Sequence, residues 1–133
     1  MKSYLNCCFL FSILLLISCK KDNNNSNNNI SNGTWRVTLF TDSGNDETSD
    51  FSGYSFTFGN NGVLTATKAG SSKTGTWSNP GNEFNIDLGE KSDSNKPLGE
   101  LTDDWDIISK SSTEIKLKDD NDASAEFLTF QKN

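Results

Sequence analysis

The sequence contains no histidine, and its three cysteines, Cys7, Cys8 and Cys19, all lie close to the N-terminus. Beyond Cys19 the chain therefore offers neither an imidazole nor a thiol. This composition excludes zinc sites built from cysteine and histidine. It also excludes Ser-His-Asp and Cys-His catalysis in their usual form. A domain without disulfides depends on its hydrophobic core for stability.

Positive charge is also scarce. Lysine and arginine total 12 against 18 acidic residues, the formal net charge is -6, and Arg36 is the one arginine. Binding to nucleic acid requires clustered lysine and arginine to neutralise phosphates. The composition therefore predicts no nucleic-acid partner. The acidic balance favours solubility and does not identify a substrate.

Long apolar runs are missing except for residues 7–17, which follow Lys2. This run is too short for a permanent membrane-spanning helix and is typical of a targeting segment. Residues 16–19 read LISC and resemble a bacterial lipobox. The resemblance implies cleavage between Ser18 and Cys19, followed by acylation of Cys19, with palmitate among the chains. We therefore predict a signal peptide over residues 1–18. We also predict that the mature protein is attached to a membrane by its acyl chains, because attachment through two or more chains is stable. An ordinary secretory signal is the alternative.

The next segment, residues 19–32, is rich in asparagine. Such a composition cannot bury apolar area, so it predicts a disordered tether with a reach of roughly 20 Å. Its charged start, CKKD, partly resembles the signal that directs some Bacteroidota lipoproteins to the cell surface. We predict an outer-membrane lipoprotein and leave the periplasmic and cell-surface sides open.

The remainder, residues 33–133, has the length of one domain. Apolar and polar residues alternate with a period of two, and turn residues interrupt the alternation at short intervals. The pattern predicts eight strands, at residues 33–40, 54–58, 63–68, 73–78, 83–88, 104–109, 113–118 and 125–130. The longest connection contains residues 97–103, for which we predict a short helical turn.

Eight strands joined by short links form an antiparallel meander with one apolar face that must be covered. Closure into an up-and-down barrel covers this face and removes the exposed edges. A two-sheet sandwich is the alternative, but its crossing connections are longer than most links in this chain. We therefore predict an all-β fold, an eight-stranded antiparallel barrel over residues 33–133.

The first strand begins Gly33-Thr34-Trp35, which is similar to the Gly-x-Trp signature of lipocalins. Residues 33–133 resemble small lipocalin-like lipoproteins of Bacteroidota, a group with no assigned activity. The stretches that carry this resemblance are GTWRVTLFTDSGNDETSDFSGYSFTF, GTWS, LTDDWDIIS, TEIKLKD and EFLTFQKN. The resemblance implies that Trp35 plugs one end of the barrel. The second lipocalin motif, Thr-Asp-x-x-Tyr, is missing, and the cation nearest to the C-terminus is Lys132 rather than an arginine.

Alternation along each predicted strand indicates which side chains face the interior of the barrel. An eight-stranded barrel is filled by its own side chains or holds one small ligand, and both alternatives stay open at this point. If a cavity exists, its mouth lies opposite Trp35, and the candidate lumen residues are Trp35, Tyr54, Phe56 and Trp77. Leu39 is predicted to face inward with Trp35.

Two acidic loops, residues 42–50 and 119–122, carry oxygen ligands at close spacing. They lack the EF-hand pattern, so we interpret them as solvated turns and predict no metal, with calcium as the alternative. Asp103, Asp104 and Asp106 surround Trp105, but alternation places Asp104 and Asp106 on the outer face, away from any cleft for paired carboxylates. We predict that the protein is not an enzyme and uses no cofactor.

The leading functional hypothesis is therefore non-enzymatic binding of a small apolar or amphipathic molecule by a lipocalin-like lipoprotein. The alternative is a structural or interaction lipoprotein with a solid core, whose loops contact another protein or a glycan. The interior discriminates between the two, because only the first needs an open cavity. The sequence does not specify the oligomeric state.

Overall fold

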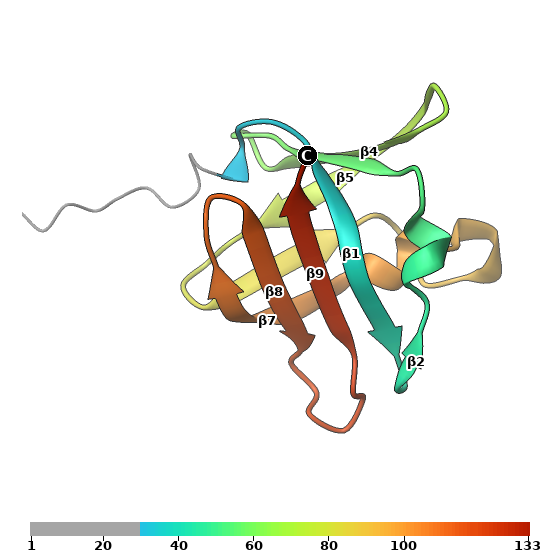
Figure 1. Cartoon of the computed structure of the whole chain (residues 1–133), viewed down its shortest axis with the longest axis vertical. Coiled ribbons are helices and arrows are strands. Elements are labelled where there is room, and N and C mark those ends of the chain that lie inside the picture. Colours follow the sequence, from blue (N-terminus) through green and yellow to red (C-terminus); the bar gives the residue numbers. More distant parts are fainter. Residues whose placement is uncertain (1–29) are drawn as a thin grey trace, which may run out of the picture.

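The computed structural model describes residues 30–133 (Figure 1). The predicted signal peptide, residues 1–18, the acylated Cys19 and most of the tether lie outside the described residues. The described chain is built from strands and short 3-10 turns. The strands are β1 (Trp35–Asp42), β2 (Asn45–Asp46), β3 (Ser55–Phe58), β4 (Val63–Lys68), β5 (Ser71–Ser78), β6 (Glu83–Asp87), β7 (Asp103–Lys110), β8 (Glu114–Asp119) and β9 (Phe127–Lys132).

The strands form one closed antiparallel barrel. Each strand from β3 to β8 pairs with the strand that follows it, and both β3 and β9 pair with β1, which closes the ring. The two-residue β2 pairs with the end of β1 and is a hairpin arm outside this ring. The prediction of an eight-stranded up-and-down barrel is confirmed. The 3-10 turn η3 (Leu98–Leu101) confirms the short helical turn predicted within residues 97–103.

Two β-bulges change which side chains face the interior. The register of β1 against β9 shifts between Val37 and Leu39. Because a bulge adds one residue to a strand, the alternation of sides inverts after it. Phe40 is consequently buried, while Leu39 is 37% exposed. The prediction that Leu39 faces inward is therefore wrong. A second shift in β7, between Ile107 and Ser109, leaves Ile108 on the surface.

The folded part begins earlier than predicted. Ile30 is fully buried, and its carbonyl accepts a hydrogen bond of 2.9 Å from the indole N–H of Trp35. The predicted domain start at residue 33 is therefore too late, because Ile30 belongs to the core and not to the tether. Composition could not reveal this, since one isoleucine among asparagines carries no periodic signal. Among the described residues, no helix is long and apolar enough to span a membrane.

The seam between β1 and β3 is the least paired part of the ring. A single residue pair, Trp35 with Phe56, joins the two strands. Below this pair, the 3-10 turn η1 (Thr48–Phe51) lies against β1 and inserts Phe51 into the core. The Thr48 hydroxyl accepts a hydrogen bond of 2.9 Å from the Phe40 backbone N–H. A short turn thus takes the place of further ladder hydrogen bonds along the seam.

Candidate functional site

Aromatic rings occupy the centre of the barrel. Phe58 is fully buried and makes edge-to-face contacts with four rings. Its centroid distances are 6.2 Å to Trp35, 5.3 Å to Trp77, 5.4 Å to Phe84 and 5.3 Å to Phe130. Edge-to-face pairs at these distances are favourable beyond the area that they bury. The centre of the barrel is thus filled by its own aromatic side chains. This is the packing expected of the alternative hypothesis, a lipoprotein with a solid core.

The four candidate lumen residues divide into two groups. Trp35, Phe56 and Trp77 are buried in this core. Tyr54 differs, because it precedes β3 at the edge of the seam and is half-buried. Its ring packs against Phe51 with a centroid distance of 6.4 Å. Tyr54 is therefore the candidate residue that also reaches the surface.

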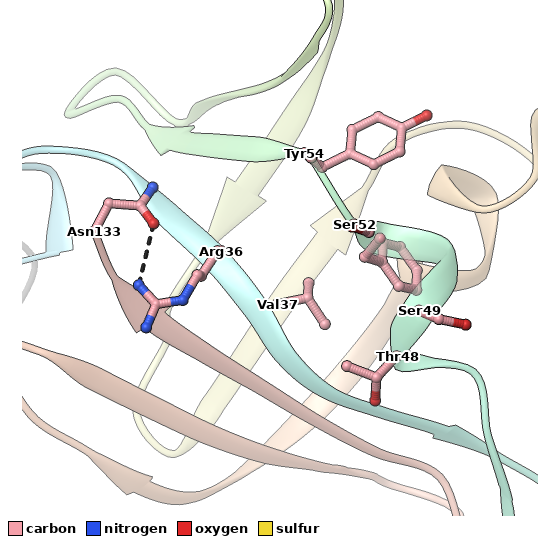
Figure 2. A pocket seen from close by; sticks show the side chains of 9 residues that line it. Arg36, Val37, Thr48, Ser49, Ser52, Tyr54 and Asn133 are labelled. Atoms are coloured by element: carbon pink, nitrogen blue, oxygen red, sulfur yellow. Dashed lines mark hydrogen bonds between the residues drawn. The ribbon is translucent and has the colours of Figure 1, made fainter.

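A pocket of about 510 Å³ opens on the outer surface beside Tyr54, at the seam between β1 and β3 (Figure 2). This seam pocket has the size of a small-molecule site. Val37 and Phe51 are buried side chains in its lining, whereas most other lining residues carry polar groups. The lining residues are Arg36, Val37, Thr48, Ser49, Phe51, Ser52, Gly53, Tyr54 and Asn133. The lining is therefore amphipathic.

Arg36 is held in a defined position on one side of the seam pocket. Its Nη1 donates a hydrogen bond of 3.2 Å to Oδ1 of Asn133 (Figure 2) and another of 3.2 Å to the carbonyl of Lys132. Its Nη2 donates to Oε1 of Gln131 at 3.3 Å. All three acceptors are neutral groups near the end of β9. Among the described residues no carboxylate lies within salt-bridge distance of Arg36.

A second pocket of about 250 Å³ shares Tyr54 with the seam pocket. Lys68 and Lys73 contribute its charged groups, and Ser71 and Ser72 contribute hydroxyls. The ammonium group of Lys68 lies 4.7 Å from the centroid of the Tyr54 ring, a cation–π geometry. The Lys73 ammonium group donates a hydrogen bond to Oδ1 of Asn95. Tyr54 thus separates two openings that both carry positive charge.

An acidic cluster lies elsewhere, where the end of β8 meets the start of β7. The carboxylates of Asp103, Asp119 and Asp120 come within 4.8 Å of one another. Lys91 forms a 2.6 Å ion pair with Asp103. Burial disfavours the charge of Lys91, but the hydrogen bond and charge of Asp103 outweigh this effect and raise its pKa. The cluster already contains its own counter-ion, Lys91. Residues 119–122 were predicted to form a solvated turn, but Asp119 in this turn is buried.

Some acidic side chains of the two loops accept hydrogen bonds from backbone N–H groups of the same loop. Asp46, in the loop 42–50, accepts a 2.9 Å hydrogen bond from the Thr48 backbone N–H. Asp119 accepts one of 3.0 Å from the Asn121 backbone N–H. Burial alone raises the pKa of Asp119, but hydrogen bonds, including this one, outweigh it and lower the pKa. These carboxylates therefore have local structural partners.

The candidate carboxylates around Trp105 do not converge. Asp103 pairs with Lys91, and Asp106 lies 3.5 Å from the ammonium group of Lys118. Asp104 is exposed on β7. Two of the three carboxylates thus have lysine partners of their own.

Sequence reasoning did not identify Arg36 or η1 as parts of a site. The pocket forms where η1 lies beside the short β1–β3 pairing. This arrangement brings together residues whose proximity cannot be predicted from a local sequence pattern. One signal was present in the sequence: Arg36 is the single arginine of an acidic chain. That signal marks a residue but not its neighbours.

The structure defines a closed antiparallel β-barrel with a packed centre and a pocket on its outer wall. Comparison with protein-family models and with curated proteins found no match. The fold is similar to the crystal structure of a DUF4847 family protein from Bacteroides vulgatus, with a TM-score of 0.58, 18% sequence identity and coverage of 78% of this chain and 94% of that chain. It is also similar to the NMR structure of a protein from Burkholderia xenovorans, with a TM-score of 0.50, 12% identity and coverage of 82% and 87%. At these identities the similarity extends to the fold alone.

Proposed function

We propose that this chain is a lipocalin-like, non-enzymatic binding protein that takes up a small amphipathic molecule in the seam pocket on the outside of its barrel. The observation that carries the proposal is the contrast between the two spaces. Aromatic rings fill the centre of the barrel, whereas the seam pocket has about 510 Å³ and an amphipathic lining. The ligand position thus differs from the lumen site that the sequence suggested.

The polar groups of the seam pocket suit recognition of a ligand. Ser49 and Ser52 are exposed, and a serine hydroxyl both donates and accepts hydrogen bonds. Val37 and Phe51 provide apolar contact beneath them. The lining includes no carboxylate side chain that would act as a general acid or base. These features support binding rather than catalysis.

Native mass spectrometry of the full chain, purified from its own host, tests this proposal. We expect the folded protein to retain a small molecule. In the Ser49→Trp variant the added indole should fill the pocket, and the molecule should be lost. Ile108→Trp is the matched control, because Ile108 is 53% exposed on β7 and does not line the pocket. Retention of the molecule by Ser49→Trp, or its absence from the wild-type protein, would contradict the proposal.

We further propose that Cys19 is acylated and anchors the protein to the outer membrane. Cys19 lies outside the described residues, so the proposal depends on the LISC motif and on the short apolar run before it. Labelling with a palmitate analogue should mark the wild-type protein and not Cys19→Ser, which should leave the membrane fraction. The Cys8→Ser variant controls for loss of a thiol. Labelling of Cys19→Ser would overturn the assignment.

Contact with a partner protein is the second candidate function. Leu39 on β1 and Phe127 on β9 are both exposed, at 37% and 41%, and they lie on neighbouring paired strands. Large apolar side chains that lie together on a surface are typical of interaction sites. Cross-linking in intact cells tests this candidate. We expect a cross-linked partner with the wild-type protein and its loss from a Leu39→Ser, Phe127→Ser double variant.

A further inference from the structure

The charged side chains that line the two pockets beside Tyr54 are positive, whereas the chain as a whole is negative. The sequence has a formal net charge of -6. Nevertheless, Arg36 lines the seam pocket, Lys68 and Lys73 line its neighbour, and neither lining contains an aspartate or glutamate. Asp50 belongs to η1 but is exposed and is not part of the lining. The positive charge at this place is therefore local.

These cations have no carboxylate partner in the described part of the chain. The ion pairs found there involve four other lysines, Lys91, Lys96, Lys116 and Lys118. An unpaired cation keeps its full attraction for a ligand, because no internal carboxylate has to be displaced. Several such cations at one pair of pockets also raise the local concentration of anions.

Arg36 has free donors in a fixed orientation. A guanidinium group has five N–H donors, and Arg36 uses three of them on Lys132, Asn133 and Gln131. The two that remain are on Nε and Nη2. Two N–H groups suit the two oxygen atoms that a carboxylate or phosphate presents. Because the three existing bonds already orient the group, the Arg36 side chain loses less conformational entropy when a ligand binds to it.

We infer that the ligand of the seam pocket carries a carboxylate or phosphate group, which binds to Arg36, while its remaining polar groups contact Ser49 and Ser52. The inference rests on the proposed binding function and specifies its ligand class. Lys68 and Lys73 strengthen the attraction from the neighbouring pocket, and they can contact a ligand that extends past Tyr54. The ligand is thus an anionic amphipathic molecule.

Titration of the ¹⁵N-labelled full chain in a polyoxyethylene detergent tests this inference. The probes are D-glucuronate and D-glucose 6-phosphate, with D-glucose as their neutral counterpart. We expect at least one anionic probe to shift the amide signals of Arg36, Ser52 and Tyr54, and D-glucose to leave them unchanged. Because loss of a charged hydrogen-bond partner typically changes affinity by about tenfold or more, Arg36→Gln should weaken the response to this extent.

Two variants keep the result independent of folding defects. Arg36→Lys retains the charge and should recover part of the affinity. Lys110→Gln removes one positive charge outside both pockets and should bind like the wild-type protein. If Lys110→Gln weakens binding as much as Arg36→Gln does, net charge explains the effect and the inference is overturned.

The anionic group that binds to Arg36 could belong to a free small molecule or to a lipid headgroup. Binding to lipid vesicles distinguishes these two ligands. Here the full chain carries Cys19→Ser, so that an acyl anchor does not drive the association. Arg36-dependent binding to phosphatidylcholine vesicles containing phosphatidylglycerol, and not to pure phosphatidylcholine, would identify a headgroup. Arg36-dependent binding to the soluble probes would identify a free molecule, and either result supports the inference.

Failure of the inference is distinguishable from failure of the proposed function. If D-glucose shifts the same signals as strongly as D-glucuronate, the pocket binds ligands without using charge. The same conclusion follows if native mass spectrometry finds a neutral retained molecule that Ser49→Trp loses. In both cases the binding function stands and the anionic ligand class is overturned. If no anionic probe or vesicle binds, the inference is also overturned.

Discussion

At the scale of single residues, each of the three tryptophans connects a strand to a neighbouring segment through its indole N–H. Each N–H donates to a backbone carbonyl outside the tryptophan's own strand. The acceptors are Ile30 for Trp35 at 2.9 Å, Gly59 for Trp77 at 2.9 Å and Leu101 for Trp105 at 3.1 Å. A buried indole needs such a partner. The tryptophans therefore satisfy their own polar atom and also fix the segments that border the barrel.

Gly75 is required because β5 and β6 approach closely. A Cβ at position 75 would lie 1.9 Å from the carbonyl oxygen of Asp87 and 3.1 Å from the Cα of Leu88. The obstacles are backbone atoms, which cannot move without separating the strands. We expect Gly75→Ala to lower the free energy of unfolding by about 2–4 kcal/mol, in the range of severe overpacking.

Urea denaturation measures this change. Thr74→Ala is the matched control, because Thr74 is exposed on the same strand, and its effect should stay within about 0.5 kcal/mol. Equal stability of Gly75→Ala and the wild-type protein would show that β5 and β6 are farther apart than the structure places them.

Glu126 makes stability depend on pH. Burial raises the pKa of Glu126 to about 7 from 4.5, with a smaller contribution from a hydrogen bond with Asp42 and from the charges of Asp42 and Asp119, while Lys91 opposes the shift. Between these values the folded state binds a proton that the unfolded state has lost. The free energy of unfolding should therefore fall as pH rises from about 4.5 to about 7. Above that range the contribution of Glu126 to the free energy of unfolding should be constant.

Urea denaturation at a series of pH values tests this dependence. Glu126→Gln stays neutral, so we expect it to lose most of the decline and to exceed the wild-type protein in stability at pH 8. Glu83→Gln, on the exposed face of β6, should keep the wild-type slope. A Glu126→Gln variant that retains the full decline would rule out this carboxyl group as its source.

At the scale of elements, η1 shapes both the barrel wall and the seam pocket. It fills the unpaired part of the seam between β1 and β3 and contributes Thr48, Ser49 and Phe51 to the seam pocket. The residues that follow it, 52–54, also line the pocket. Its main contact with the core is Phe51, which is buried and lies 5.1 Å from the ring of Phe40 in an edge-to-face arrangement. One element thus closes the barrel wall and forms the pocket.

Truncation of Phe51 should weaken both roles of η1. We expect Phe51→Ala to lower the free energy of unfolding by about 3–5 kcal/mol, as is typical for a buried phenylalanine. Hydrogen exchange should rise most in residues 47–54, because the turn loses its attachment to the core. Ser49→Ala, which changes the same turn at an exposed position, should have little effect on either measurement. Uniformly raised exchange across the barrel, with no excess in this segment, would contradict a local role.

At the scale of the whole molecule, one closed sheet surrounds one core. Every strand of the ring has a neighbour on both sides, and within residues 30–133 the buried hydrophobic side chains form one cluster. Such a domain should unfold in one cooperative step. The tryptophans lie on β1, β5 and β7 and so report on separated parts of the ring.

We therefore expect the urea transitions measured by tryptophan fluorescence and by far-UV circular dichroism to coincide. The far-UV signal reports the strands, and the fluorescence reports the packing around the indoles. Both should change together, because opening the ring at any strand exposes the shared core. Two separate transitions would show that part of the barrel is an independent unit.

The fold was predictable from the sequence to a large extent, whereas Tyr54 was the one predicted residue that lines the candidate site. Alternation in residues 83–88, with Phe84 and Ile86 inward, follows directly from the two-residue period of a strand, and the structure buries both side chains. The bulge in β1 was not predictable, because it depends on the register that β9 imposes. It reverses the sides of Leu39 and Phe40.

The sequence by itself determined an acidic, all-β, single-core barrel, because strand alternation and short links are local properties that any closed meander must satisfy. Only the tertiary structure decided that aromatic rings fill the centre and that Arg36, η1 and Tyr54 meet at the seam. The physical reason is that a packed interior and a pocket depend on distances between residues far apart in the chain. Those distances result from register, bulges and closure, which local pattern does not encode.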